Sequence, residues 1–473
     1  MLRTAFLILS GNATASLLLL ARNLIVARLI PVEDYGIAAT FAVVMAMVEM
    51  ASAFGLQQQI VQSEDGDDPR FQAALQGFQV LRGVAAGIAL FLIAGPIARF
   101  LGIPEVIWAY QLLALVPVIK AFEHFDIHRL NRQMRFWPLM LTGGVPALLS
   151  LMLAWPLTIW LSDWRVMLYS ILAQIAVTAL TSHLVAERPY RIVFDRAIMG
   201  RSLRFGWPIL VNSVLLFLVF QGDKLIVGRV LGMEALAVFA MGMMLTLTPT
   251  MVLAKSAQNF FLPQLSRRAA EPGEASVFVA LSHAALQASL LNGAFIILAA
   301  NLIGPYLINS LFAGKYNDLI PLVSLFALLN GIRVFKSGPA QVALARGHTS
   351  NAMISNLPRV IALPFAWGIL EAGGTLVHIL WLGIIAEFVG YFISLALISK
   401  RVHIPLFPLW HAAAAVTGFL VLSTGAFGYL WSGSSIESLE HYIFFLAFIV
   451  LLATMRNLHR IFLETRNCFG PSL

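Results

Sequence analysis

Ten charged side chains interrupt long apolar stretches of this sequence, and they are its best candidates for chemistry. Seven are basic, namely Arg22, Arg82, Lys120, Lys224, Lys255, Arg333 and Arg359. Three are acidic, namely Glu49, Asp223 and Glu387. In a bilayer each such charge costs about 2.5–3.5 kcal/mol, so it normally faces a cavity or a partner. The basic excess predicts an anionic ligand, because guanidinium groups bind phosphate oxygens through paired hydrogen bonds.

Six of the basic residues, all except Lys120, are our candidates for substrate binding. They are Arg22, Arg82, Lys224, Lys255, Arg333 and Arg359. The alternative is that the side chain reaches out of the membrane to the headgroups. It applies to the five residues near ends of apolar segments, which are Arg22, Lys120, Lys224, Lys255 and Arg333. Arg82 also lies near the start of its segment, and Arg359 lies nearest the middle of one.

Arg22 shares a helical stripe with small and polar residues. At 100° per residue, Thr4, Gly11, Ala15 and Arg22 fall on one side of a helix that is otherwise rich in leucine. Such a stripe favours an inward face, with Arg22 lining a cavity. Close helix packing by small residues explains the same pattern.

The three acidic residues are candidates for coupling or gating. Glu49 and Glu387 could take up protons or sodium ions in an ion-driven transporter, and a structural carboxylate with satisfied partners is the alternative. Asp223 matches Arg22 in an internal repeat described below. We therefore expect the Arg22–Asn23 pair and the Asp223–Lys224 pair to face each other when no substrate is bound.

No residue pattern predicts an enzyme, a metal site or a cofactor. The sequence contains neither a phosphate-binding Walker segment, nor a His-Glu-x-x-His zinc motif, nor a Gly-x-Ser-x-Gly elbow. The single cysteine, Cys468, excludes an intrachain disulfide. His124 and His128 are spaced like a metal-binding pair, but the neighbouring Arg129 and Arg132 favour a solvated or headgroup-facing turn.

These side chains must be positioned by membrane helices. The sequence is 59% apolar and 11% charged, whereas a soluble protein is about 25% charged, which excludes a soluble enzyme, a nucleic-acid binder and a large external domain. About 20 residues make one transmembrane helix. Fourteen apolar segments occur, at 4–27, 35–61, 79–100, 106–122, 139–155, 166–185, 205–227, 236–254, 277–302, 319–332, 352–370, 375–398, 409–430 and 442–455. The tenth and the fourteenth are short. The predicted fold class is an all-α polytopic membrane protein.

The distribution of basic residues predicts the orientation. With the N-terminus inside, the even loops and the two tails contain 19 of the 31 Lys and Arg residues, and the odd loops contain 5. Cytoplasmic loops carry the basic excess in membrane proteins. Both termini are therefore predicted to be cytoplasmic.

An internal repeat relates residue i to residue i+201. Leu24-Ile25-Val26 aligns with Leu225-Ile226-Val227, and 9 of the 34 positions from Leu24 to Gln57 are identical. The offset covers six segments, an even number, so the copies share one orientation in the membrane. We predict two six-helix lobes, residues 1–200 and 201–402, related by a parallel pseudo-two-fold axis. Residues 403–473 then contain two extra helices and a cytoplasmic tail.

Short motifs resemble the MOP exporter superfamily, and most closely its Wzx-type flippases of polysaccharide repeat units. The resembling segments are residues 21–29, 34–36, 204–208, 222–228 and 261–266. The resemblance implies alternating-access transport of a polyprenyl-pyrophosphate-linked oligosaccharide from the cytoplasmic to the periplasmic leaflet of a bacterial inner membrane. It also implies that Arg22 lines a central cavity, as an arginine does in peptidoglycan-precursor flippases. A polysaccharide polymerase and the export machinery are expected partners, and nucleic acid is not.

Two other functions remain open from the sequence. The first is an ion-coupled exporter of small molecules or drugs, although the first segment lacks the proline usual in the multidrug branch. The second is a membrane glycosyltransferase or polymerase, which usually needs a large external loop or a catalytic acidic motif. The predicted outside loops are short, so an enzyme is not expected.

Overall fold

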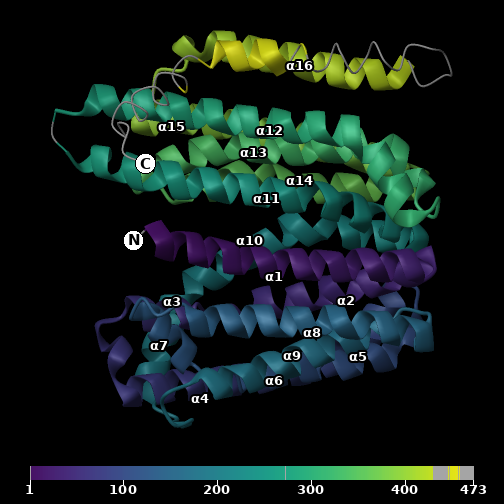
Figure 1. The fold of residues 1–473 in the computed structure, drawn as a ribbon, viewed down its shortest axis with the longest axis vertical. Coiled ribbons are helices and arrows are strands. Elements are labelled where there is room, and N and C mark those ends of the chain that lie inside the picture. The colour runs from purple at the N-terminus through teal and green to yellow at the C-terminus, as the bar shows by residue number, and fades with distance from the viewer. Residues whose placement is uncertain (1, 272, 430–445, 447, 456–457, 459–473) are drawn as a thin grey trace. The chain divides into compact units, whose positions relative to one another are not determined.

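The computed structural model describes residues 2–271, 273–429, 446, 448–455 and 458, and every regular element among them is a helix (Figure 1). This confirms the predicted fold class. The chain divides into two compact units, Met1–Ala240 and Met241–Leu473. The repeat instead divides the chain after residues 200 and 402, and that division stays a prediction.

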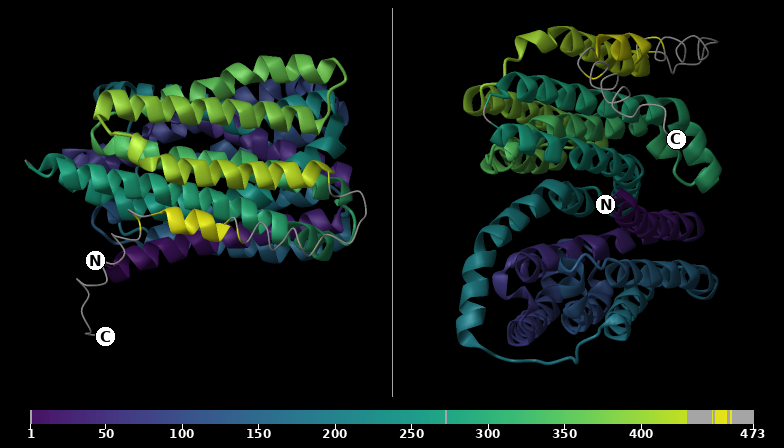
Figure 2. Two further views of the ribbon diagram at one scale, coloured as in Figure 1. Left: turned by 90° about the horizontal axis from the view of Figure 1, so that it is seen from above. Right: turned by 60° about the vertical axis from the view of Figure 1, so that its left-hand side comes forward.

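The first unit contains ten α-helices, two short 3₁₀ helices and the first turns of α11 in its described part. The helices are α1 (Leu2–Leu29), α2 (Val32–Ala51), α3 (Leu56–Gln62), η1 (Glu64–Asp67), α4 (Pro69–Phe100), η2 (Pro104–Val106), α5 (Ile107–Leu113), α6 (Leu115–Ala121), α7 (Asp126–Arg132), α8 (Trp137–Leu161), α9 (Arg165–Val185) and α10 (Arg196–Val230). The segment 186–195 joins α9 to α10 along the outside of this unit (Figure 2).

The second unit begins within α11 (Gly232–Ala270). Its other described helices are α12 (Ala275–Phe312), η3 (Asn317–Leu322), α13 (Val323–Ala345), α14 (Ser350–Glu371), α15 (Leu376–Val402), η4 (Phe407–Leu409) and α16 (Trp410–Tyr429). Within each unit the long helices lie side by side, as α8 does with α9 and α12 with α13 (Figures 1 and 2).

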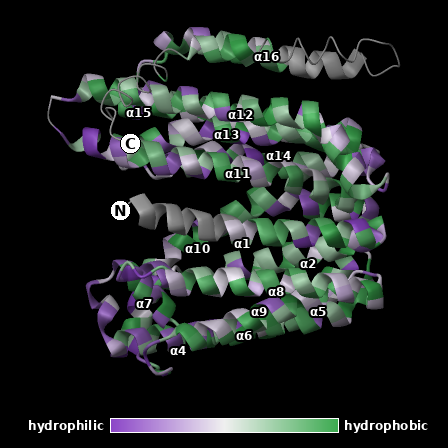
Figure 3. Cartoon of the chain, viewed as in Figure 1, coloured by the Kyte–Doolittle hydropathy of each residue, from purple (hydrophilic) through white to green (hydrophobic). Residues whose placement is uncertain are grey.

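Hydropathy places most of these helices in a membrane. Eleven helices of the described chain are long and apolar enough to cross one. Figure 3 shows apolar residues along the long helices and polar residues gathered near their ends. The chain is therefore a multi-pass membrane protein. The first thirteen apolar segments each correspond to helices, and the fourteenth lies only in part within the described residues, at 446 and 448–455.

Capping residues explain where two of the long helices of the first unit begin. The Asp68 carboxylate accepts hydrogen bonds from the backbone N–H groups of Arg70 and Phe71, with Pro69 in the first turn of α4. Asp195 caps α10 in the same way and also binds Arg70 Nη2 at 2.9 Å. One arginine therefore ties the starts of α4 and α10 together.

Two apolar segments are broken where the sequence predicted continuous spans. The second stops at Ala51, and the chain turns through Gly55, whose φ of +63° suits glycine, before α3 begins. The fourth is divided into η2, α5 and α6. Pro117 has no N–H to bond the carbonyl of Leu113, which explains the break between α5 and α6.

The tenth segment is longer than predicted. We expected it to end at residue 332, but α13 continues to Ala345, and together with η3 it covers 29 residues. The predicted orientation counted Lys336 as a cytoplasmic loop residue, which was wrong, because Lys336 lies inside α13. The helix continues because Val342 and Ala343 extend its buried face beyond the charges. Removing Lys336 from the count leaves the basic excess on the predicted inner side intact.

Candidate functional site

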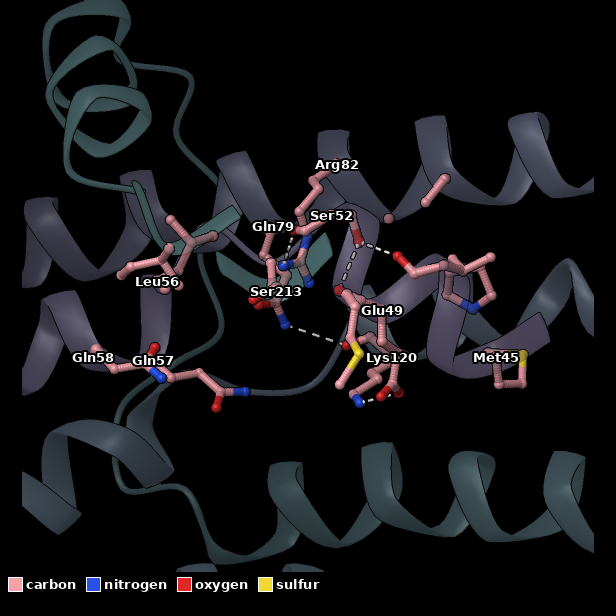
Figure 4. A pocket seen from close by; sticks show the side chains of 18 residues that line it. Met45, Glu49, Ser52, Leu56, Gln57, Gln58, Gln79, Arg82, Lys120 and Ser213 are labelled. Carbon is pink, nitrogen blue, oxygen red and sulfur yellow. Dashed lines mark hydrogen bonds and ion pairs between the residues drawn. The ribbon is translucent and has the colours of Figure 1, made fainter. Parts of the chain in front are cut away.

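The first unit contains a polar cavity of about 290 Å³, which we call the Arg82 cavity. It opens where α2 ends and the chain turns into α3, and residues of α4, α6 and α10 complete its wall. Its polar lining includes Glu49, Ser52, Gln79, Arg82, Lys120 and Ser213 (Figure 4). Two residues that the sequence singled out, Glu49 and Arg82, thus share one cavity with Lys120.

The charged groups of the Arg82 cavity are held in place by short contacts. Lys120 Nζ lies 2.5 Å from Glu49 Oε1, and Arg82 Nη1 donates to the carbonyl of Ser52 at 2.8 Å (Figure 4). Gln79 Nε2 donates to the carbonyl of Lys120 at 3.2 Å. In the described part of the chain, Arg82 Nε is buried without an acceptor. Two cations against one carboxylate leave one positive charge and an unused donor for a ligand.

The break between α2 and α3 creates the acceptor for Arg82. Helix α2 ends at Ala51, so the Ser52 carbonyl is outside the α2 hydrogen-bond ladder and can accept from a side chain. The same break aligns Gln57 and Gln58 with the cavity wall. Amide side chains both donate and accept hydrogen bonds, as sugar hydroxyl groups require.

A second group of charges is buried in the second unit, and we call it the Glu387 cluster: Arg333, Lys336, Arg359 and Glu387. Arg333 Nε binds Glu387 Oε1 at 2.7 Å, and Lys336 Nζ binds Glu387 Oε2 at 2.7 Å. Arg359 Nε lies 4.0 Å from Glu387 Oε1. The side chain of Glu387 is 1% exposed and those of Arg333 and Lys336 are 9% and 11% exposed. The cluster therefore carries two more positive charges than negative ones.

This arrangement bears on the predicted role of Glu387. Both of its oxygens are occupied by cations from α13 that belong to the protein itself. A free coupling ion or proton would have to displace one of them. In this conformation, both oxygens of Glu387 are thus paired within the protein.

Lys336 completes the cluster, and sequence reasoning missed it as a site residue. The available signal was the spacing of Arg333 and Lys336, because residues three apart lie on the same face of a helix. Lys336 also donates to Asn356 Oδ1 at 2.7 Å, which connects α13 to α14. We did not predict Lys336 as a site residue because the tenth segment was predicted to end at residue 332, before Lys336.

Lys255 lies on a different cavity in the second unit, of about 320 Å³. Three of its lining residues, Met251, Ala254 and Gln258, match three lining residues of the Arg82 cavity at the offset of 201. Their counterparts are Met50, Ala53 and Gln57. The two matched segments thus line a cavity in each unit, although α11 continues where α2 breaks.

Arg22 is buried inside the first unit and does not reach out of it. Its Nη1 donates to Ser150 Oγ at 2.9 Å and to Gln174 Oε1 at 2.8 Å, which lie on α8 and α9. Nε and Nη2 both donate to Asn23 Oδ1. In this conformation, the Arg22 side chain therefore does not extend to the lipid headgroups. The surroundings of Thr4 and Gly11, which share its predicted stripe, are outside what the structure describes.

Asp223 and Lys224 lie next to each other on α10. Asp223 is 6% exposed, and Lys224 Nζ donates to Gln221 Oε1 at 3.0 Å. All of the hydrogen bonds of the Arg22 side chain to described residues go to Asn23, Ser150 and Gln174. The predicted facing of the Arg22–Asn23 and Asp223–Lys224 pairs stays a prediction.

The segment around α7 is buried, contrary to the solvated turn that we expected. His124 is 3% exposed and His128 is 7% exposed. Asp126 accepts from Arg129 Nε at 2.5 Å and from the backbone N–H of Glu187 at 2.8 Å. Burial opposes ionisation of Asp126, but these bonds outweigh it and lower the pKa of the carboxyl group. Arg129 favoured a solvated turn in the sequence, but its guanidinium group pairs with Asp126 inside the fold.

The buried histidines do not form part of a metal centre in the described chain. Within those residues, no group of three or more His, Cys, Asp or Glu side chains is arranged to hold a metal ion. Burial lowers the pKa of His128 to about 4, so its ring is neutral near pH 7. Both histidines therefore act as neutral groups of the α7 core.

The fold is that of known membrane transporters. A solved structure of the lipid II flippase MurJ in an inward closed conformation matches with a TM-score of 0.70, covering 97% of this chain and 99% of that chain at 14% identity. An inward-facing multidrug resistance MATE family transporter of the MOP superfamily matches with a TM-score of 0.65, covering 82% and 95% at 17% identity. At these identities the matches establish the shared fold.

Sequence comparison decides the family. The family model described as polysaccharide biosynthesis protein matches residues 25–332. The chain belongs to this polysaccharide biosynthesis protein family. A succinoglycan biosynthesis transport protein, ExoT of Rhizobium meliloti (strain 1021), is 23% identical over 248 residues, which cover 50% of this chain. The match spans about half of that relative, 48% of its length. The resemblance inferred from the short motifs is thus confirmed at the level of family and fold.

Proposed function

We propose that this protein is a flippase that moves polyprenyl-pyrophosphate-linked oligosaccharide repeat units from the cytoplasmic to the periplasmic leaflet by alternating access. The observation that carries the proposal is the excess of positive charge among the membrane helices. The Arg82 cavity has two cations against one carboxylate, and the Glu387 cluster has three against one. A pyrophosphate link is anionic and suits such groups. The family and the named relatives support a role in polysaccharide biosynthesis.

The Arg82 cavity is the place we propose for first contact with the substrate. Arg82 and Lys120 supply charge, and Gln57, Gln58 and Gln79 supply amide groups for hydroxyl-rich sugars. The other proposed substrate-binding residues are Arg22, Lys224, Lys255, Arg333 and Arg359. We propose gating roles for Glu49, Asp223 and Glu387, because salt bridges such as Glu49–Lys120 can open when a competing anion binds.

The proposed location is a bacterial inner membrane, with both termini in the cytoplasm. This rests on the basic excess in the predicted inner loops. A polysaccharide polymerase and the export machinery are proposed as partners, since the flipped repeat unit must be consumed on the far side. We propose no enzymatic step and no cofactor.

Depletion of the protein in its own cells tests the flippase proposal. Lipid-linked oligosaccharide should accumulate on the cytoplasmic leaflet, and surface glycan should fall. Normal surface glycan together with drug hypersensitivity would favour a small-molecule exporter. Continued presence of unlinked precursor, without any lipid-linked repeat unit, would favour a glycosyltransferase. Lipid-linked repeat units that accumulate on the periplasmic leaflet would favour a polymerase.

Complementation with Arg82→Gln tests the site. Losing one charge-assisted hydrogen bond costs about 1.5–3 kcal/mol, so flipping of the lipid-linked substrate should fall roughly tenfold or more at limiting substrate. Arg99→Gln is the matched control, because Arg99 is an exposed arginine near the end of α4, outside the Arg82 cavity. Equal activity of the two variants would remove Arg82 from the proposed site.

A further inference from the structure

A separate cavity of about 240 Å³ lies at one end of the first unit, and we call it the His124 cavity. Its wall combines the start of α4, His124 before α7 and part of the segment 186–195. The candidate spans α4, α6 and α9 all begin or end here, at Pro69, Ala121 and Val185. The cavity therefore lies at a boundary between membrane and water. It shares no lining residue with the Arg82 cavity.

The lining of the His124 cavity is basic and polar. Arg188, Arg191 and His124 line it, together with Gln72 and Gln76. Among the described residues that form its wall, none is acidic. An anion in this cavity would meet two guanidinium groups without a competing carboxylate in the wall.

His124 offers a hydrogen-bond donor that has no acceptor. Its Nδ1 accepts the backbone N–H of Asp126 at 3.1 Å, so a neutral ring carries its proton on Nε2. In the described part of the chain, Nε2 is buried and has no hydrogen-bond partner. Leaving a buried donor unpaired is unfavourable, and a bound acceptor would remove that cost.

The two arginines differ in a way that suits a binding site. Arg188 is held by Gln72 Oε1 at 2.9 Å and by the carbonyl of Asp67 at 2.8 Å. Its guanidinium is therefore already oriented before a ligand arrives. Arg191 is exposed, and no hydrogen bond or ion pair of its side chain to the described residues is present. Its guanidinium is available to close over an anion.

We propose that the His124 cavity binds a phosphate group, held by the Nε2–H of His124 and the guanidinium groups of Arg188 and Arg191. The volume suits a phosphate monoester or a lipid headgroup, and not an oligosaccharide chain. A phosphate there would connect α4, the segment before α7 and residues 186–195. The site lies outside the proposed transport cavity, so its role would be anchoring or regulation of the first unit.

Phosphate titration into the purified, delipidated full-length protein tests this site. Inorganic phosphate should bind saturably, and Arg191→Gln should weaken that binding about tenfold or more, since a charge-assisted hydrogen bond is lost. His124→Phe should have a similar effect while keeping an aromatic ring. Arg196→Gln is the control, because Arg196 is exposed on the neighbouring turn of α10 and does not line the cavity.

Two questions are tested separately, namely whether the site binds phosphate and whether that phosphate belongs to a lipid or is free in solution. In nanodiscs, phosphate binding that is blocked by phosphatidylglycerol but not by phosphatidylcholine would identify a lipid headgroup as the ligand. Binding of free phosphate in the presence of either lipid would identify a soluble ligand. Wild-type affinity in Arg191→Gln would overturn the proposal, as would equal weakening by Arg196→Gln. Arg191 is exposed, so this variant is expected to fold even if His124→Phe does not. Binding is measured without transport, so failure here leaves the flippase proposal untouched.

Discussion

The role of a charged residue in this protein depends on the groups that it contacts. Glu387 lies among three cations, and its carboxylate forms ion pairs with Arg333 and Lys336. Burying a charge without a partner is far more costly than burying a pair. The stability of the second unit should therefore depend strongly on this carboxylate.

Glu387→Gln should destabilise the second unit by about 3–5 kcal/mol, because it removes the buried carboxylate that pairs with Arg333 and Lys336. The measurement is thermal or chemical unfolding of the purified protein in detergent. Glu371→Gln is the control, since Glu371 is exposed at the end of α14. Unchanged unfolding of Glu387→Gln would mean that another anion compensates the cluster.

His128 should make the stability of the first unit depend on pH. Burial lowers its pKa from 6.5 to about 4, so between these values the unfolded chain binds a proton that the folded chain does not. The free energy of unfolding should therefore fall as the pH falls, by about 2 kcal/mol from pH 7 to pH 5.

The variant His128→Phe isolates this contribution in unfolding experiments at both pH values. Burial lowers the pKa of His124 as well, and it raises the pKa of Glu123, which acts in the opposite sense. Both groups remain in the variant. The loss of stability between pH 7 and pH 5 should be smaller in His128→Phe, and an identical loss in both proteins would refute the assignment.

At the scale of helices, close approach depends on small residues at particular positions. A Cβ atom on Gly390 of α15 would lie 2.3 Å from the carbonyl oxygen of Ser355 on α14. A backbone atom cannot move aside as a flexible side chain can. The same α14–α15 pair carries Arg359 and Glu387, so its spacing also sets the geometry of the Glu387 cluster.

Gly390→Ala should destabilise the protein by about 1–3 kcal/mol, because the added methyl group forces α14 and α15 apart. Gly368→Ala on α14 provides the comparison, since nothing lies within 4 Å of its Cβ position. That change should be neutral or stabilise by about 0.4–1 kcal/mol. Only Gly390→Ala should lower the unfolding midpoint, and an equal decrease in both variants would contradict the packing explanation.

At the scale of the whole molecule, the predicted orientation can be tested with single cysteines. Cys468 is the only native cysteine, so Cys468→Ser gives a cysteine-free background. Ala372→Cys lies between α14 and α15, and Thr349→Cys lies between α13 and α14. Intact cells treated with a membrane-impermeant maleimide should label Ala372→Cys, whereas Thr349→Cys should react only after permeabilisation. The reverse pattern would invert the orientation.

The sequence alone predicted the membrane environment, the helical fold and the family resemblance. These properties are local: hydropathy is summed over about 20 consecutive residues, and the motifs are short runs such as residues 222–228. Boundaries were less well predicted. Pro117 divides one segment, and Gly55 lies in the turn where another ends. Helix α13 continues past Arg333 and Lys336, although the segment was predicted to end at residue 332.

Only the tertiary structure decided which charges meet. Arg333 and Glu387 are 54 positions apart, and Arg22 and Gln174 are 152 positions apart. The sequence left open whether Arg22 faces a cavity or the lipid headgroups. In the structure, Arg22 donates hydrogen bonds to neutral side chains on α8 and α9. Periodicity along one helix shows which residues share a face, but the partner of that face is chosen by packing of distant helices, where paired charges bury at far lower cost than single ones.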